Sequence, residues 1–319
     1  MKFKNLISIF YLLAGLMMIF YVSKGFLNDI DEIKNSLASV SIISIILAII
    51  LYVLSHLFRV LRLTVLSSDS SISIKDLTNE QFKANGVNLI IPFRLGESYR
   101  ILVFKKFFGS YFRSFNILLC ERMLDITLIS VILIIATYFS DVQFDFIRNI
   151  IYISISVMIF LLLVYFVLDE FLLIIHQIFL GKDVNKTNIT IVKITSALLN
   201  VIKETKNIFK SKLASCMAIS LIIWTLEILV FYVLFINLNL SKFVMIFLAT
   251  SVALSSLLPN GPIGYGGVQL AFFLIGIAIG YENMIIHSYS YNFFIFGSGL
   301  FIASVLFLIS SVKSFRGTK

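Results

Sequence analysis

The chain has 319 residues, of which 59% are hydrophobic and 13% charged, and its mean hydropathy is +1.01. A soluble domain has a smaller apolar share and could not bury this many runs of about 20 apolar residues in one core. Composition therefore excludes the soluble classes and predicts an all-α, polytopic membrane helix bundle. The net charge of +9 is typical of basic inner loops, and attraction to anionic lipid headgroups is the alternative explanation.

The expected spans follow the apolar runs in chain order. The first run, residues 6–22, follows the basic start MKFKN and lacks a small-residue cleavage pattern, so we expect a retained span. Five further spans are expected at residues 37–58, 115–139, 147–168, 213–236 and 284–312. Two other apolar stretches, 84–112 and 243–280, are interrupted by proline and glycine, which favours broken or re-entrant helical hairpins.

Loop charges orient these spans. Lys2 and Lys4 precede the first run, whereas the next loop holds three acids and two lysines, so we expect a cytoplasmic N-terminus. Residues 59–113 contain nine Lys or Arg against four acids, and residues 169–212 contain seven against four, which predicts that both stretches lie inside, as does the C-terminus. Six crossings satisfy every loop, and eight do so if the 243–280 hairpin crosses twice; we favour re-entry.

The first charged cluster lies in the segment IPFRLGESYR. It places Arg94, Glu97 and Arg100 three residues apart, so that on a helix they share one face. A bilayer makes such a stripe costly unless its charges are paired or functional. These residues are the first candidates for a site.

The second cluster, CERMLD, begins the third expected span. Glu121, Arg122 and Asp125 fall within two helical turns, and Arg94 and Arg100 are available as partners. One interpretation is a salt-bridged clamp that holds the broken segment against this span. The other is a polar cavity in which arginine forks bind a lipid phosphate, and the two are compatible.

The third cluster is SSLLPNGPIGYGGVQ, residues 255–269, where two prolines and four glycines separate apolar arms. Backbone broken at membrane depth needs protein or a watery cavity around it, and the following half-helix would direct its positive N-terminus there. A plain surface turn is the alternative. In the fifth expected span, residues 213–236, Glu227 is the only acid, and we expect it to face the interior.

Other chemistry receives little support. Cys120 and Cys216 lie in apolar runs and are expected to be packing residues. The three histidines are far apart and match no metal signature, so we expect no metal and no cofactor. We assign no catalytic residue, because no nucleophile elbow is present, and no nucleic-acid partner, because no basic stripe alternates with stacking aromatics.

The motifs resemble a known family. IPFRLGESYRILVFKK followed by ERMLD is similar to the paired signature of the lysylphosphatidylglycerol synthase transmembrane-region family of flippase-like proteins. Trp224 and Glu227 match its tryptophan, two-spacer, glutamate element, and LLPNGPIGYGGVQ matches its proline and glycine-rich element. One departure is Gln269, where the family commonly has glutamate, so the charge for a proton-linked role is missing. The positions carried over are Arg94, Gly96, Glu97, Arg100, Glu121, Arg122, Asp125, Trp224, Glu227, Pro259, Gly264 and Gly266. Gly261 and Gln269 are further candidate residues of the expected re-entrant loop.

The resemblance implies a membrane domain that moves or presents lipids. We expect one such domain over residues 1–319, without an attached soluble synthase. A composition rich in Ile, Phe, Lys and Asn favours a prokaryotic cytoplasmic membrane. The favoured hypothesis is a flippase for an anionic phospholipid or a polyprenyl-linked glycan. Arg94, Arg100 and Arg122 would bind the headgroup, and Glu97, Glu121 and Asp125 would hold the arginines. The alternative is a membrane subunit of, or an enzyme in, lipid modification or glycosyl transfer, with a glycosyltransferase partner. A homodimer, the lipid and the energy source are left open.

Overall fold

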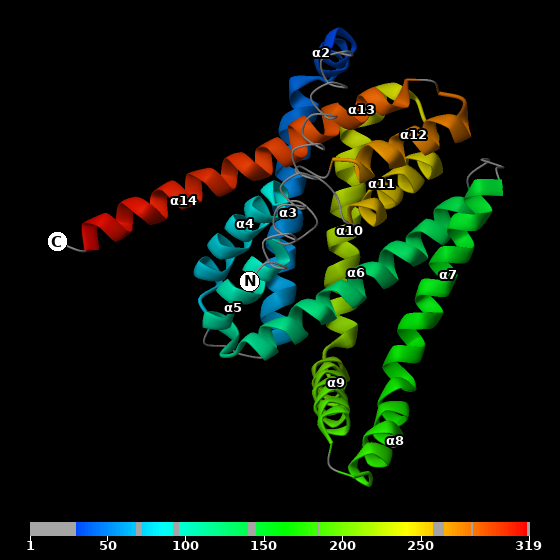
Figure 1. Ribbon diagram of the computed structural model, residues 1–319. Helices are drawn as coiled ribbons and strands as arrows, with labels where there is room; N and C mark the ends of the chain where they lie inside the picture. Colours follow the sequence, from blue (N-terminus) through cyan, green and yellow to red (C-terminus); the bar gives the residue numbers. More distant parts are fainter. Residues whose placement is uncertain are drawn as a thin grey trace, which may run out of the picture.

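The computed structural model describes residues 30–67, 72–91, 96–139, 145–183, 185–257, 265–281 and 283–317, and the regular structure in these ranges is helical. The bundle is built around α3 (Ile42–Ser67) and α10 (Leu213–Phe235), which make the most extensive helix contact in these ranges (Figure 1). The all-α prediction is confirmed. The first expected span, residues 6–22, lies outside the described residues.

Three of the described helices are long and apolar enough to cross a membrane, namely Ile42–Ser67, Leu213–Leu238 and Met284–Ser310. A bent pair, Ser154–Phe166 and Leu168–Leu180, passes the same test as one unit, with an angle of 53° between its halves. The expected span 115–139 lies within α6 (Tyr111–Phe139), the helix that carries the CERMLD cluster. The number of crossings and the sides of the termini stay predictions.

The boundary expected at residue 58 is wrong. A separate helix, α2 (Ile30–Ser39), precedes α3, and α3 continues to Ser67. The physical reason is that the apolar helical pattern persists beyond residue 58, because Val60, Leu63 and Leu66 are all buried. Two arginines that the charge count assigned to the inner loop, Arg59 and Arg62, therefore belong to a membrane helix.

The helices end where proline and glycine predict breaks. The first hairpin consists of α4 (Ile74–Ile90), whose N-terminus is capped by the Ser73 hydroxyl, and α5 (Gly96–Phe108). The second consists of α11 (Lys242–Leu257) and α12 (Gly267–Ile279), and Gly266 before α12 has a φ of 99°, a conformation that favours glycine. Re-entry of either hairpin into the membrane stays a prediction.

The stretch 169–212, which was expected to be an inner loop, forms a helical hairpin, and its side of the membrane stays a prediction. After α7 (Asp145–Phe166), the chain forms α8 (Leu168–Leu180) and α9 (Lys186–Lys210), which pack against each other. Asn185 caps α9, its side-chain oxygen accepting a hydrogen bond of 2.7 Å from the amide of Asn188. In Figure 1, α7 and α8 stand to the right of the central helices and α9 lies below α10.

The last expected span is continuous but not uniform. It comprises α13 (Met284–Tyr291), a π-helical segment (Asn292–Phe296) and α14 (Gly297–Gly317), which extends away from the bundle at the left of Figure 1. Small residues let α14 approach α4 closely: a Cβ on Gly86 would collide with the side chain of Ala303.

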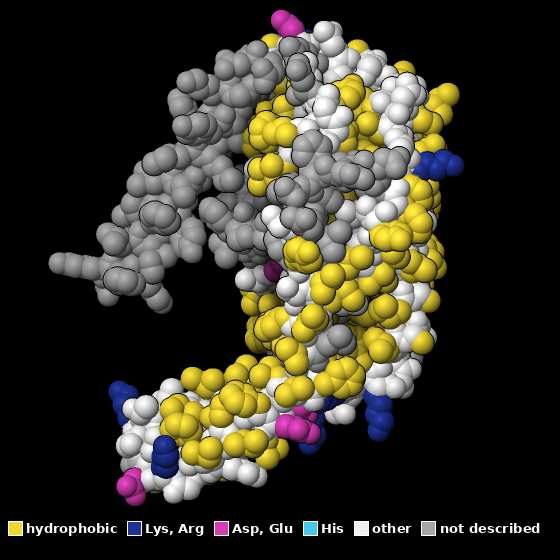
Figure 2. Space-filling model, turned by 90° about the vertical axis from the view of Figure 1, so that its right-hand side faces the viewer, with side chains coloured by type: hydrophobic (Ala, Val, Ile, Leu, Met, Phe, Trp, Pro, Cys, Tyr) yellow, Lys and Arg dark blue, Asp and Glu magenta, His cyan; other side chains and the backbone are white. Residues whose placement is uncertain are grey.

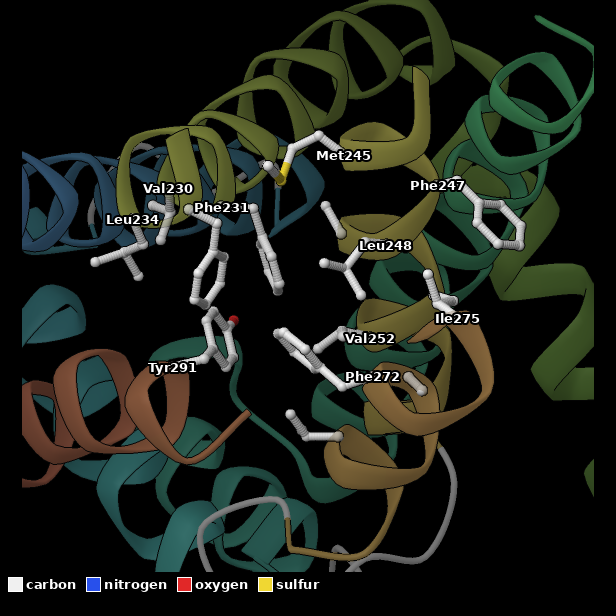
Figure 3. Packing of buried hydrophobic residues seen from close by; sticks show 14 of the residues in the cluster. Val230, Phe231, Leu234, Met245, Phe247, Leu248, Val252, Phe272, Ile275 and Tyr291 are labelled. Atoms are coloured by element: carbon white, nitrogen blue, oxygen red, sulfur yellow. The ribbon is translucent and has the colours of Figure 1, made fainter. Parts of the chain in front are cut away.

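The two largest apolar clusters of the described residues form most of the core. The larger joins α10, α11, α12 and α13 with residues of α3 and α6, and in it the rings of Phe231 and Tyr291 stack with centroids 4.4 Å apart (Figure 3). The second joins α3, α4, α5, α6, α9 and α10 and includes Leu63, Phe104, Cys120 and Cys216. Along α3, the polar residues between Tyr52 of the first cluster and Val60 of the second leave a polar layer between them.

Candidate functional site

Charged side chains from four helices meet in the polar layer between the two apolar clusters. They comprise four arginines and four acids, so the formal charge of this group of described residues is zero. The members are Arg59 and Arg62 of α3, Glu97 and Arg100 of α5, Glu121, Arg122 and Asp125 of α6, and Glu227 of α10.

Arg62 is the buried centre of this group. Its side chain is 0% exposed, and its guanidinium donates to Asp125 Oδ1 at 2.7 Å and to Asp125 Oδ2 at 3.2 Å. It also donates to the Ser220 hydroxyl at 2.7 Å and lies 3.2 Å from Glu121 Oε1. The bidentate pair of Arg62 with Asp125 joins α3 to α6, and its hydrogen bond to Ser220 joins α3 to α10.

Arg100 forms the second buried centre. Its side chain is 3% exposed, and its Nη2 donates to Glu121 Oε2 at 3.0 Å and to Gln81 Oε1 at 3.1 Å, while Nη1 donates to Glu97 at 3.0 Å. Glu121 therefore lies between Arg62 and Arg100. Buried charges of this kind depend on one another, because removing one partner leaves the other uncompensated in an apolar setting.

Arg122 and Glu97 form a more open pair. Arg122 Nη2 donates to Glu97 Oε1 at 2.6 Å, and the two side chains are 27% and 25% exposed. The Nη1 of Arg122 is 3.6 Å from Asp125 Oδ2, so this partly exposed arginine contacts the buried Asp125 as well as Glu97.

Arg59 is held less tightly than the buried arginines. Its Nη2 is 3.3 Å from Glu227 Oε1 and its Nη1 is 3.5 Å from Asp125 Oδ2, both longer than the 2.7 Å contact between Arg62 and Asp125. The guanidinium lies over the Trp224 ring at 5.4 Å, an arrangement that favours a cation. Glu227 also accepts from the Ser55 hydroxyl at 2.7 Å.

A cavity of about 180 Å³ opens beside these residues. One part of its lining is charged and consists of Arg59, Glu97, Arg100, Glu121, Arg122 and Glu227. Another part belongs to the large apolar cluster. It includes Phe231, Val252 and Tyr291, which Figure 3 shows gathered at the cluster's centre, and also Ile228, Ala249 and Phe296. The cavity therefore suits an amphiphile, whose polar group needs partners and whose remainder does not.

Most of the predicted site residues that the structure describes come together. Seven contribute to the network or contact it: Glu97, Arg100, Glu121, Arg122, Asp125, Trp224 and Glu227. Gly96 lies where α5 approaches Asn88 of α4. Arg94, Pro259, Gly261 and Gly264 lie outside the described residues.

Gly266 and Gln269 are placed elsewhere. The Gln269 Oε1 accepts a hydrogen bond of 2.9 Å from the Gly266 amide and so caps α12, and neither residue lines the cavity. A glutamate at this position would make the same hydrogen bond. The departure from the family's pattern is thus compatible with a helix-capping function.

Sequence reasoning missed Arg59 and Arg62. Both were counted as loop charges, although they are three residues apart inside the apolar pattern FRVLRLTVL. That spacing places them on one helical face, which is the signal that could have identified them.

The described residues contain no group of three or more His, Cys, Asp or Glu side chains that could hold a metal ion.

Comparison with known proteins gave one finding. A family model described as Lysylphosphatidylglycerol synthase TM region matches residues 6–308, nearly the whole chain. Neither the curated proteins nor the solved structures contain a match to the chain.

Proposed function

The chain belongs to the lysylphosphatidylglycerol synthase TM region family, a family of membrane proteins that handle lipids, and we propose that it is flippase-like. In this proposal it translocates or presents an anionic phospholipid or a lipid-linked glycan. The observation that carries the proposal is the cavity with a partly charged and partly apolar lining, in the interior of an apolar helix bundle. Ionisable groups in such a place are costly and are typically kept for function.

Of the three arginines that line the cavity, the two more exposed ones, Arg59 and Arg122, bind the phosphate. Arg59 and Arg122 are 12% and 27% exposed, whereas Arg62 and Arg100 are almost fully enclosed by acids. A guanidinium presents a planar fork of donors that matches phosphate oxygens, so a partly engaged arginine can accept a second oxyanion. Arg62 and Arg100 then act as positioning residues, and Arg94 is retained as a further phosphate ligand on the sequence evidence.

The size of the cavity limits what enters it. Its volume of about 180 Å³ corresponds to roughly six water molecules at the 30 Å³ share of liquid water. A phosphate with a short polar group fits this space. For a lipid-linked glycan, the phosphate next to the lipid would enter, and the sugars beyond the first would stay outside.

The alternative, an enzyme or enzyme subunit in lipid modification or glycosyl transfer, needs a carboxylate that can take up a proton. Each of the four acids lies within 3.3 Å of an arginine nitrogen, an arrangement that neutralises arginine rather than presenting a base. This favours transport. Product formation by the purified protein alone, absent from a Glu121→Gln and Asp125→Asn variant, would favour the enzyme.

The test is a lipid scrambling assay with purified protein in liposomes that contain fluorescent phosphatidylglycerol, phosphatidylethanolamine or a polyprenyl-phosphate sugar. We expect movement of at least one of these lipids, slowed at least about tenfold by Arg59→Gln with Arg122→Gln, because charge-assisted hydrogen bonds contribute roughly 1.5–3 kcal/mol each. Arg94→Gln with Arg100→Gln tests the assignment made from the sequence.

Arg113→Gln provides the matched control, because Arg113 also lies on α6 but donates to the Ser67 carbonyl, away from the cavity. It should leave the rate unchanged. Absence of movement of every lipid by folded wild-type protein would overturn the proposal. Unchanged movement by the Arg59 and Arg122 variant would remove these residues from it.

A further inference from the structure

The α8–α9 hairpin lies across the direction of the central helices. In Figure 1, α9 is seen almost end-on while α3 and α10 run lengthwise, and in Figure 2 the hairpin forms the arm at the lower left. The bend of 53° between α7 and α8 turns the chain out of the direction of α7. A helical hairpin placed crosswise at the end of a membrane bundle has the orientation of an interfacial element.

Apolar side chains line the outside of this hairpin. Six of them are 42% to 57% exposed: Phe171, Ile174 and Ile178 of α8, and Ile189, Ile194 and Leu198 of α9. In α8 they recur at intervals of three and four residues, so they form one helical face. Figure 2 shows hydrophobic side chains along the arm, with charged side chains at its tip and edges.

The hairpin has an excess of basic residues, which is concentrated in α9. Residues 168–210 hold six lysines and four acids, a net charge of +2, whereas α9 alone holds five lysines and one glutamate, a net charge of +4. Four lysines of α9 are exposed: Lys186, Lys193, Lys203 and Lys210. The single acid of α9, Glu204, accepts a hydrogen bond of 2.7 Å from Asn116 of α6. The Glu204 carboxylate therefore faces α6, and the exposed charge of α9 is positive.

An apolar contact fixes the hairpin to one end of the bundle, because Phe209 of α9 belongs to the apolar cluster that contains Val60 and Leu63 of α3. The two helices of the hairpin are joined to each other by a partly exposed pair, Lys206 with Asp169 of α8 at 2.7 Å. The chain enters α10 directly after α9, at Leu213. This is the end that the excess of Lys and Arg predicts to be cytoplasmic.

We propose that the α8–α9 hairpin is a docking surface for an anionic lipid leaflet, lying in the headgroup region with its apolar side chains among the acyl chains. The inference stands independently of the proposed transport. A surface of anionic lipid satisfies both features at once, since lysines meet headgroup charges while the exposed Phe, Ile and Leu side chains leave water. An acidic soluble protein would match the charge alone.

The experiment uses the full chain in phosphatidylcholine vesicles with a rising fraction of phosphatidylglycerol. An environment-sensitive fluorophore is attached at Leu198→Cys, or at Asn207→Cys, a position on the exposed polar side of α9. The wild-type chain is the labelling blank, because Cys120 and Cys216 are both buried. We expect the label at 198 to shift to the blue and to be quenched by lipid-borne nitroxide as phosphatidylglycerol increases, while the label at 207 stays accessible to iodide.

The charge dependence is tested by Lys193→Gln with Lys203→Gln. Partition of the hairpin into the anionic surface should fall by roughly fivefold for each lysine removed. The matched control is Lys34→Gln with Lys242→Gln, which removes the same charge from exposed sites beside the other end of α10. This control should leave the partition of the hairpin into the anionic surface unchanged.

Two outcomes would overturn the inference. A label at 198 that remains in water at every phosphatidylglycerol fraction would show that the hairpin does not lie on the leaflet. This is the result expected if the hairpin instead binds an acidic protein. Burial that is independent of phosphatidylglycerol, or equally weakened by the control pair, would remove the selectivity for anionic lipid.

Discussion

At the scale of single residues, the site is a set of arginines whose exposure decides their function. Arg62 has two carboxylates within 3.2 Å and no exposed surface, whereas Arg59 is 12% exposed and lines the cavity. A guanidinium enclosed by acids can only hold helices together, while one that reaches a cavity can bind a ligand. The same residue type thus serves two purposes within one layer.

Arg62→Met should destabilise the protein by roughly 3–5 kcal/mol, because Asp125 would remain buried without its bidentate partner. Thermal unfolding in detergent measures this, followed by the emission of Trp224, the chain's single tryptophan, whose Nε1 donates to Asp125 at 3.1 Å. The double change Arg62→Met with Asp125→Leu should recover part of the loss. Equal stability of Arg62→Met and wild type would contradict the clamp.

Gln269→Glu should leave stability and lipid movement unchanged, because a carboxylate accepts the same hydrogen bond from the Gly266 amide and suits a helix N-terminus. Gln269→Ala should cost about 1 kcal/mol, the usual effect of losing a cap. Thermal unfolding distinguishes the two variants. New proton-dependent movement in Gln269→Glu would mean that the position does more than cap α12.

At the scale of elements, the α4–α5 hairpin positions the charged face of α5. Gly96 is the first residue of α5, and it lies against Asn88 of α4. Arg100, one turn later, then reaches Gln81 of α4 and Glu121 of α6. The break between α4 and α5 therefore allows Arg100 to lie between α4 and α6.

Gly96→Ala should lower stability by roughly 1–3 kcal/mol and slow lipid movement, because the new Cβ would stand 2.8 Å from the amide nitrogen of Asn88 and force α5 away from α4. Thermal unfolding and the liposome assay report the two effects. Gly297→Ala is the control, since a Cβ there meets nothing within 4 Å. A Gly96→Ala protein as stable as this control would refute the close-packing explanation.

At the scale of the whole molecule, the two ends of the bundle differ in charge and in form. Near the start of α3, α2 and the chain after α10 come together, with the Asn237 amide donating to the Ser39 carbonyl at 3.0 Å. At the far end of α3 lies the basic α8–α9 hairpin. A protein with one basic and one nearly neutral end is oriented by the positive-inside rule.

We predict that cysteines introduced at Lys34 and at Lys182 lie on opposite sides of the membrane, the first outside and the second in the cytoplasm. In intact cells, a membrane-impermeant maleimide should modify Lys34→Cys and spare Lys182→Cys until the cells are opened. The two native cysteines give no background, because both are buried. Modification of both positions in intact cells would contradict the predicted orientation.

The sequence by itself determined the helical class, the membrane setting and the two interruptions. Mean hydropathy and the helix-breaking action of proline are local properties, and the chain's three prolines all fall at the expected breaks, at positions 92, 259 and 262. The CERMLD and GESYR spacings likewise identified one charged face on each of two helices.

The tertiary structure alone decided which charges meet. The closest partner of Asp125 is Arg62 of α3, a residue 63 positions earlier. Glu227 of α10 pairs with Arg59, which also lies on α3. The tertiary structure also turned an expected loop into the crosswise α8–α9 hairpin. The reason is that residue spacing shows which side chains share a face of one helix, whereas the partner of a buried charge depends on which faces of different helices are brought into contact by the packing of the two apolar clusters.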